Sequence, residues 1–191
     1  MIKYKKEDIK DVKDALLNSK IVAFPTDTVF GLACLYGDEL AYQKIYEAKN
    51  RSINKKLPIM VSDYDMLARY CEIDEKTKKL INKFMPGAIT LILKYKDYDE
   101  TVAVRMPDNK WIIDLIKIID KPLYVTSANI SGNGSLIKCE DVLNQIGDKV
   151  DGIVMADASG KQASTIVDCV NNFEILREGP ISISQIMDVL K

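Results

Sequence analysis

The sequence predicts an α/β fold in which residues 1–191 form a single domain, with a twisted mixed sheet flanked by helices. The first observation is the length of 191 residues, which suits one domain with a hydrophobic core of its own. The second is that segments patterned as strands and as helices are mixed along the whole chain. The third is that they do not alternate strictly and that strands gather late, which favours a mixed sheet over a doubly wound parallel one.

The elements of the first third follow from apolar spacing and from chain-breaking residues. Ile9, Val12 and Leu16 recur at helical spacing between charged residues, which predicts an amphipathic helix. An apolar run that ends at Pro25 is typical of a short buried strand. The expected elements, in chain order, are a helix at 7–19, a strand at 21–24, a helix at 39–49 and a strand at 57–61.

The rest of the chain is interpreted from the same signals. Pro86 and Gly87 end a charged helix, and Ser182 with Gln185 forms the capping-box pattern of a last helix. A short apolar run before Thr126 predicts a strand that leads into a polar loop. The expected elements are a helix at 74–84, strands at 88–93 and 101–105, a helix at 109–119, a strand at 123–125, a helix at 139–146, strands at 152–155, 165–170 and 173–176, and a helix that begins at 182.

The composition excludes several classes of active site. The 27 basic and 28 acidic residues give a net charge of -1, which argues against a protein-wide basic field for nucleic acids but leaves room for a local patch. There is no histidine, which excludes Ser-His-Asp and Cys-His nucleophiles, His-ligated zinc or haem and histidine proton relays. Neither standard glycine-rich phosphate loop occurs, so a nucleotide would have to bind in another way.

The cysteines and the N-terminal segment predict a cytoplasmic protein without a membrane span. Cys34, Cys71, Cys139 and Cys169 are far apart and form no C-x-x-C pair, which is typical of reduced, partly buried thiols. Residues 1–13 are rich in charge and lead into no apolar signal region. No stretch near them is apolar enough to span a bilayer.

Two polar segments that follow predicted strands are candidate ligand-binding loops. One is residues 25–32, which begin Pro-Thr-Asp-Thr, and the other is residues 125–135, which are rich in Ser, Thr and Asn. Hydroxyls, amides and backbone N–H groups at the carboxyl ends of strands are common ligand contacts. An ordinary turn, whose side chains satisfy their own backbone, explains either segment as well.

Four basic side chains are candidate ligands for an anion. Lys49 and Arg51, on either side of Asn50, stand at the end of a predicted helix, where the helix dipole alone also favours basic residues. Arginine binds phosphate or carboxylate through two N–H groups, and lysine acts as a point charge. Arg105 ends an apolar strand and Arg177 follows another, and a buried arginine needs an acidic partner or a ligand. The residues thus indicate an anionic small molecule without naming a reaction.

Seven motifs occur in one order along the chain: FPTDTVFGL, KNR, PGAITLIL, VAVRMPD, TSANISG, STIVD and LREG. In sequence and spacing they resemble those of the YrdC/Sua5 family of threonylcarbamoyl-AMP synthases, in its short single-domain form. The resemblance implies a YrdC-like fold and a nucleotidyltransferase that combines L-threonine, bicarbonate and ATP into threonylcarbamoyl-adenylate and pyrophosphate. It also implies that a tRNA threonylcarbamoyl transferase complex uses this product to modify the adenosine beside the anticodon.

The resemblance further assigns roles to individual residues. Lys49 and Arg51 match the family's K-x-R signature and are expected to be catalytic and to bind ATP. Ser127 and Asn129 match its S-x-N signature and are expected to bind ATP. The other expected ATP contacts are Lys55, Thr101, Ser135 and Arg177, and the expected threonine or carbamate contacts are Thr28, Arg105 and Ser164. Mg²⁺ is expected to arrive with ATP on its phosphate oxygens, with no metal site in the protein itself.

Three alternatives to the synthase stay open. A paralogue of the same fold without synthase activity is disfavoured, because both signatures are present. A double-stranded RNA or tRNA-binding module conflicts with the near-neutral charge and the lack of an aromatic platform. Weak binding of tRNA or double-stranded RNA remains compatible with these two features. The carbamoyl-adenylate domain of hydrogenase maturation proteins normally lies in a much larger chain with zinc-finger-like cysteines.

Overall fold

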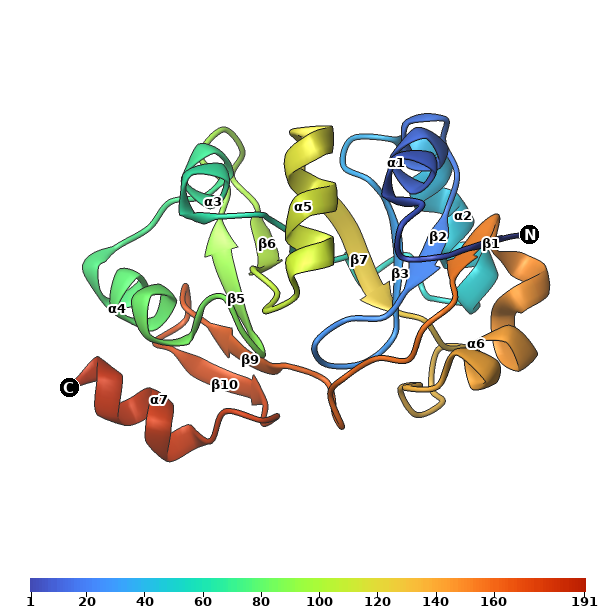
Figure 1. Ribbon diagram of the computed structural model, residues 1–191. Helices are drawn as coiled ribbons and strands as arrows, with labels where there is room; N and C mark the ends of the chain where they lie inside the picture. The colour runs from blue at the N-terminus through green and yellow to red at the C-terminus, as the bar shows by residue number, and fades with distance from the viewer.

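One sheet of ten strands runs through the computed structural model, which describes residues 1–191 (Figure 1). The strand order is β1-β8-β2-β3-β7-β4-β6-β5-β9-β10. The strands are β1 (Ile2–Tyr4), β2 (Val22–Phe24), β3 (Gly31–Leu35), β4 (Ile59–Met60), β5 (Ile89–Lys94), β6 (Thr101–Arg105), β7 (Leu123–Ser127), β8 (Gly152–Val154), β9 (Thr165–Asp168) and β10 (Glu174–Arg177). The helices are α1 (Ile9–Leu17), α2 (Glu39–Lys49), α3 (Tyr64–Tyr70), α4 (Glu75–Phe84), α5 (Lys110–Ile119), α6 (Cys139–Ile146) and α7 (Ile183–Leu190).

Parallel and antiparallel neighbours are combined in this sheet. The pairs β1–β8, β2–β8, β4–β6 and β5–β9 are parallel. The other neighbouring pairs are antiparallel. The predicted α/β fold with a mixed sheet flanked by helices is thereby confirmed, and a doubly wound parallel sheet is excluded.

Short polar residues fix the starts of most helices. Four side chains accept a hydrogen bond from a backbone N–H of the first turn, namely those of Asp38, Asp63, Asp74 and Asn109. Ser182 forms the predicted capping box with Gln185. Because these signals are local in the sequence, α2, α4, α5 and α7 begin at or next to their predicted starts.

Helices cover the two faces of the sheet unequally. The larger core, of 28 buried residues, packs one face against α1, α3, α4, α5 and α7. The smaller core, of 17 buried residues, packs the other face against α2 and α6. Figure 1 shows α5 in front of β7 and α2 behind β2. The smaller core contains no residue of β5, β6, β9 or β10, so this face is open over those strands.

Among the strands and α-helices, β1, β3 and α3 have no counterpart in the prediction, and neither does the short 3-10 helix η1 (Gly147–Lys149) that follows α6. Two of the three residues of β1 are exposed, so this edge strand shows no apolar alternation. In contrast, β3 is buried at nearly every position, and its start overlaps the polar motif at 25–32. With seven residues, α3 is too short to show helical periodicity.

The cysteines are buried as predicted. All four are free thiols, and Cys34, Cys71 and Cys139 are buried while Cys169 is half-buried. Burial raises the pKa of Cys71 and of Cys169 to about 12, so these thiols stay protonated and unreactive at neutral pH. None of the helices is both long and apolar enough to cross a lipid bilayer.

Candidate active site

A cavity of about 310 Å³ lies on the open part of the sheet, a volume typical of small-molecule sites. Side chains two residues apart on a strand face the same side, and three strands contribute such pairs. The pairs that line the cavity are Thr90 and Ile92 of β5, Ala103 and Arg105 of β6, and Ser164 and Ile166 at the start of β9. The loop that follows β2 closes the other side with Thr26 and Thr28, together with Thr126 and Ser127 at the end of β7 and Ser135 in the loop after it.

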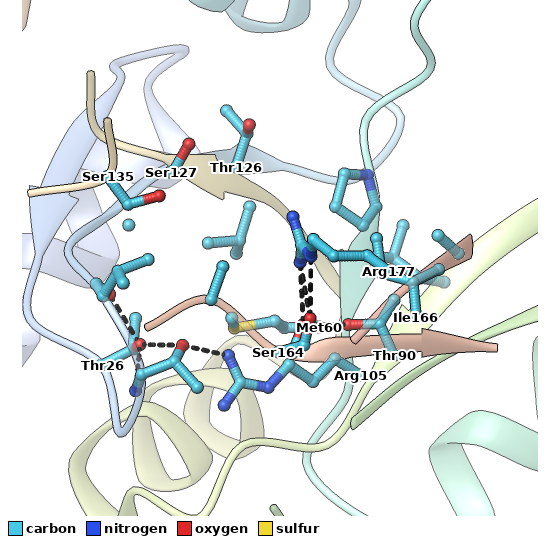
Figure 2. A pocket seen from close by; sticks show the side chains of 18 of the residues that line it. Thr26, Met60, Thr90, Arg105, Thr126, Ser127, Ser135, Ser164, Ile166 and Arg177 are labelled. Carbon is cyan, nitrogen blue, oxygen red and sulfur yellow. Dashed lines mark hydrogen bonds between the residues drawn. The ribbon is translucent and has the colours of Figure 1, made fainter. Parts of the chain in front are cut away.

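The charged side chains that line this cavity are all cationic. They are Arg51, Lys56, Arg105 and Arg177, and neither Asp nor Glu is among the lining residues. Figure 2 shows Arg105 and Arg177 at one end of the cavity and Ser127 and Ser135 at the other. A lining of guanidinium groups and hydroxyls suits a ligand that carries several negative charges.

Arg105 is held by three hydrogen bonds and is only 5% exposed. Its Nη2 donates to Asp27 Oδ2 at 2.7 Å, its Nη1 to Thr28 Oγ1 at 2.6 Å and its Nε to Gly87 O at 3.1 Å. Burial lowers the pKa of the Arg105 guanidinium, and the Asp27 carboxylate acts in the opposite direction. Since a guanidinium has five N–H donors, two remain free to bind an oxyanion.

The turn that follows β2 is held by hydrogen bonds between its own residues and by close packing of Gly160 against it. Thr26 Oγ1 donates to Val29 O at 2.7 Å and accepts from Thr28 N at 3.0 Å. Gly160 packs against the same turn, so closely that a Cβ there would lie 2.5 Å from Asp27 O. The turn therefore presents one hydroxyl and one carboxylate to the end of β6.

Ser164 connects β9 to the strands on both sides of it. Arg177 donates two hydrogen bonds to Ser164 O, from Nε at 2.9 Å and from Nη2 at 2.8 Å (Figure 2). Thr90 Oγ1 and Ser164 Oγ share a hydrogen bond of 2.7 Å. Arg177 therefore keeps its Nη1 donors for a ligand at the exposed rim of the cavity.

Arg51 reaches the cavity from the loop that follows α2. Asn50 adopts a left-handed φ of 49° and reverses the chain between the helix and Arg51. The Arg51 guanidinium donates to Lys55 O at 3.0 Å and to Lys56 O at 3.2 Å. These backbone carbonyls hold the guanidinium at the rim, where no carboxylate neutralises its charge.

Lys49 lies behind the cavity wall and is 1% exposed. Its ammonium donates to Ser127 O and, at 2.6 Å, to Asn129 O. Its own carbonyl accepts a hydrogen bond from Ser131 N at 2.8 Å. Burial, with a smaller contribution from Arg51, lowers the pKa of Lys49 to about 8. Lys49 thus ties the end of α2 to the loop that follows β7.

Comparison with known proteins identifies the family. The family model named for Sua5, YciO and YrdC, and described as "Telomere recombination", matches residues 14–179. The chain belongs to the Sua5/YciO/YrdC family. The resemblance inferred from the seven motifs is thereby confirmed.

Members of the Sua5/YciO/YrdC family resemble this chain over most of its length. It is 36% identical over 187 residues to the threonylcarbamoyl-AMP synthase of Bacillus subtilis, covering 92% of this chain and 54% of that relative. It is 34% identical over 193 residues to a relative from Methanocaldococcus jannaschii, covering 95% and 90% of the two chains. The P. abyssi Sua5 structure complexed with L-threonine matches with a TM-score of 0.88 at 30% identity, over 99% of this chain and 59% of that one. The chain thus spans about half the length of the B. subtilis relative.

Most of the site residues predicted from the family motifs line the cavity: Thr28, Arg51, Arg105, Ser127, Ser135, Ser164 and Arg177. Lys49 and Asn129 are buried behind its wall instead. Lys55 contributes a backbone carbonyl to Arg51, and its side chain is exposed. Thr101 is exposed at the opposite end of β6 from Arg105, outside the cavity, so this placement does not support its predicted contact with ATP.

Two polar residues of this Sua5/YciO/YrdC-family cavity, Thr90 and Lys56, lie outside both the predicted site residues and the two candidate loops at 25–32 and 125–135. Thr90 stands in the apolar run PGAITLIL, two positions before Ile92, and faces the cavity with it. A hydroxyl in an otherwise apolar strand was the available signal. Lys56 lines the rim beside Arg51 and forms an exposed ion pair with Glu100 at 2.7 Å. Lys55 and Lys56 are consecutive in the sequence, and no sequence feature showed that Lys56 rather than Lys55 would line the cavity.

Proposed function

We propose that this chain is a threonylcarbamoyl-AMP synthase, which forms threonylcarbamoyl-adenylate and pyrophosphate from L-threonine, bicarbonate and ATP. The observation that carries the proposal is a cavity built from the family motifs and lined by four cationic side chains and no carboxylate. The relatives support it, because the B. subtilis protein is named a threonylcarbamoyl-AMP synthase and P. abyssi Sua5 was crystallised with L-threonine.

The chemistry of this reaction suits the cavity. The threonine nitrogen attacks the carbon of bicarbonate, an N–C bond forms and water leaves, which gives a carbamate. A carbamate oxygen then attacks the α-phosphorus of ATP, and the bond to the β-phosphate oxygen breaks as pyrophosphate leaves with that electron pair. Both steps bring anionic groups together, so that fixed cations and correct positioning lower the barrier without a histidine relay.

The threonine carbamate occupies the end of the cavity that Arg105 forms. The two free N–H groups of Arg105 can bind a carboxylate bidentately, and Thr28 fixes their direction. The Ser164 hydroxyl offers a further donor beside them. Because Asp27 holds the other edge of the guanidinium, Arg105 meets the substrate in one orientation.

The nucleotide occupies the end with Ser127 and Ser135, and its phosphates extend toward the arginines at the rim. Arg51 and Arg177 are the cations that neutralise charge on the triphosphate and on the leaving pyrophosphate. Asn129 shapes the loop by donating to Ile130 O at 2.9 Å and to Asn133 O at 2.8 Å. In this proposal Arg51 is the catalytic member of the K-x-R signature, and Lys49 supports the S-x-N loop.

The phosphate oxygens of ATP would hold the Mg²⁺ that accompanies the nucleotide. Among the residues of the chain no three His, Cys, Asp or Glu side chains gather where they could hold a metal ion. The cavity lining offers hydroxyls and no carboxylate, whereas Mg²⁺ binds phosphate oxygens and water readily. When bound, the ion supplies charge neutralisation at the phosphates, and Arg51 and Arg177 provide the rest.

The test is to incubate the purified protein with ATP, Mg²⁺, L-threonine and bicarbonate and to follow pyrophosphate and threonylcarbamoyl-adenylate by mass spectrometry. Omitting each substrate in turn is the control, and product that requires all three supports the proposal. Bound ATP without product would instead favour a paralogue of the same fold that lacks synthase activity. The adenylate then passes, in this proposal, to a tRNA threonylcarbamoyl transferase complex in the cytoplasm.

A further inference from the structure

A pair of phenols on α2 holds the loop that carries Arg51. Tyr42 and Tyr46 are one helical turn apart, and their hydroxyl oxygens are joined by a hydrogen bond of 2.8 Å. Tyr46 Oη donates to Lys55 O at 2.9 Å. Arg51 Nε donates to the same carbonyl at 3.0 Å. Because a carbonyl oxygen has two lone pairs, this one atom connects the phenol directly to the guanidinium.

The phenol pair is a rigid anchor. Tyr46 is 7% exposed. The Tyr42 ring packs on Tyr124 of β7 with ring centroids 4.7 Å apart, and on Tyr46 with centroids 5.0 Å apart. Burial and then the hydrogen bond to Tyr42 raise the pKa of Tyr46. The phenol is therefore a neutral donor at ordinary pH, and it is fixed before any ligand arrives.

The Arg51 loop has few other contacts with the body of the protein. Residues 52–56 are all exposed. The ion pair of Lys56 with Glu100 is exposed on both sides, and such pairs contribute little to stability. Leu57 N lies 3.5 Å from Tyr42 Oη, which adds a weak contact to the same phenol pair. The two ends of the loop are fixed by the backbone bond from Arg51 N to Tyr46 O at 2.9 Å and by Leu57, which is buried in the smaller core. Between these ends, Tyr42 and Tyr46 make the side-chain hydrogen bonds from α2 to the loop.

We propose that Tyr46, supported by Tyr42, is a positioning residue that presets Arg51 for the phosphates of the bound nucleotide; this inference rests on the proposed function. Tyr46 does not line the cavity, so that it acts through Lys55 O and Arg51 and touches no substrate. Presetting a cation removes part of the cost of ordering it when the ligand binds. Loss of the hydroxyl should therefore weaken nucleotide binding and leave the threonine end of the cavity unchanged.

The first test compares Tyr46→Phe, which deletes the hydroxyl and keeps the ring, with the wild-type chain. The dissociation constant for ATP is measured by calorimetry, and KM values for ATP and for threonine are measured separately in the synthase assay. The ATP constants should rise roughly threefold to tenfold, which is the effect of one lost hydrogen bond, and KM for threonine should not change. Tyr98→Phe is the matched control, because Tyr98 is 64% exposed and outside this network.

The second test asks whether the effect passes through Arg51. In an Arg51→Ala background, Tyr46→Phe should cause no further change in the dissociation constant for ATP, since coupled residues are not additive. Tyr42→Phe, which leaves the Tyr46 bond to Lys55 in place, should show a smaller effect of the same kind. If Tyr46→Phe does not fold, Tyr42→Phe takes its place in the comparison between the wild-type and Arg51→Ala backgrounds.

Three results would overturn the inference: an unchanged dissociation constant for ATP in Tyr46→Phe, an equal effect with and without Arg51, or an equal rise of KM for threonine. ATP binding needs no turnover, so that this test is separate from that of the synthase. A wild-type chain that binds ATP and makes no product contradicts the proposed function alone. A wild-type chain that binds no ATP contradicts both.

Discussion

The Arg105 guanidinium and the Asp27 carboxylate form an ion pair of 2.7 Å, and the two side chains are 6% and 11% exposed. Asp27 Oδ2 also accepts a hydrogen bond from Asp108 N at 3.0 Å, and its Oδ1 is buried without a partner. Every other ion pair of the structure has at least one partner that is more than a third exposed. Asp27 is therefore the counter-charge that compensates the buried positive charge of Arg105 inside the cavity.

Replacing Asp27 with Asn should destabilise the protein by about 3 kcal/mol, because it leaves the buried Arg105 without a counter-charge. Urea denaturation followed by circular dichroism measures the change. Asp114→Asn is the matched control, since its ion pair with Lys110 lies on the exposed surface of α5 and should be worth less than about 0.5 kcal/mol. Equal unfolding midpoints for Asp27→Asn and the wild type would contradict this prediction.

Elements with local signals were predictable, and the pairing of strands was not. Asp38, Asn109 and the Ser182 box each specify a helix start within a few residues, and these helices are found where the sequence places them. By contrast, β5 pairs with β9, and Thr90 bonds to Ser164 across 74 positions of sequence. Such contacts depend on how the whole sheet assembles, which apolar spacing does not encode.

The candidate site was predictable in residue type and less so in side-chain direction. Lys49 and Arg51 are both basic and close in sequence, so that both were expected to meet the phosphates. The left-handed Asn50 between them turns the chain, and it directs Arg51 to the cavity while Lys49 is buried against Ser127. Residue spacing alone does not show such a reversal. The role of Lys49 in ATP binding stays a prediction.

Burial of Lys49 makes stability depend on pH. Its pKa is about 8 in the folded chain against 10.5 for an ordinary lysine, so that between these values the unfolded chain binds more protons. Stability therefore rises with pH across this window, as the penalty for a buried ammonium is relieved. The gain is on the order of 3 kcal/mol and is complete above the unfolded-state pKa.

Comparison with Lys49→Met isolates this effect, because the tyrosines and cysteines that also titrate at high pH are common to both chains. Urea denaturation from about pH 7 to about pH 10 should show the wild type gaining stability relative to Lys49→Met as pH rises. A difference between the two chains that stays constant, or that shrinks toward high pH, would show that Lys49 titrates normally.

Gly160 lies where a side chain cannot fit. A Cβ at this position would meet Thr28 O and Asp27 O of the turn that follows β2, and both are backbone atoms that cannot rotate away. Gly160→Ala should therefore lower the free energy of unfolding by about 1–3 kcal/mol. Gly134→Ala is the control, because a Cβ there would have nothing within 4 Å. Thermal unfolding of the two variants measures this difference. Equal melting temperatures for Gly160→Ala and Gly134→Ala would contradict the prediction that a side chain does not fit at position 160.

Arg51→Ala tests the charge at the rim of the cavity. If Arg51 stabilises charge that moves from ATP to pyrophosphate, its loss should cost on the order of 2–4 kcal/mol of transition-state stabilisation, or roughly 30-fold to 1000-fold in kcat/KM for ATP. Arg51→Lys should recover part of this activity, since lysine restores the charge without the bidentate geometry. Arg69→Ala is the matched control, because Arg69 lies on α3 and forms an exposed ion pair with Asp120, and this variant should leave turnover unchanged. Pyrophosphate release measures all three variants, and unchanged turnover in Arg51→Ala would remove Arg51 from the catalytic site.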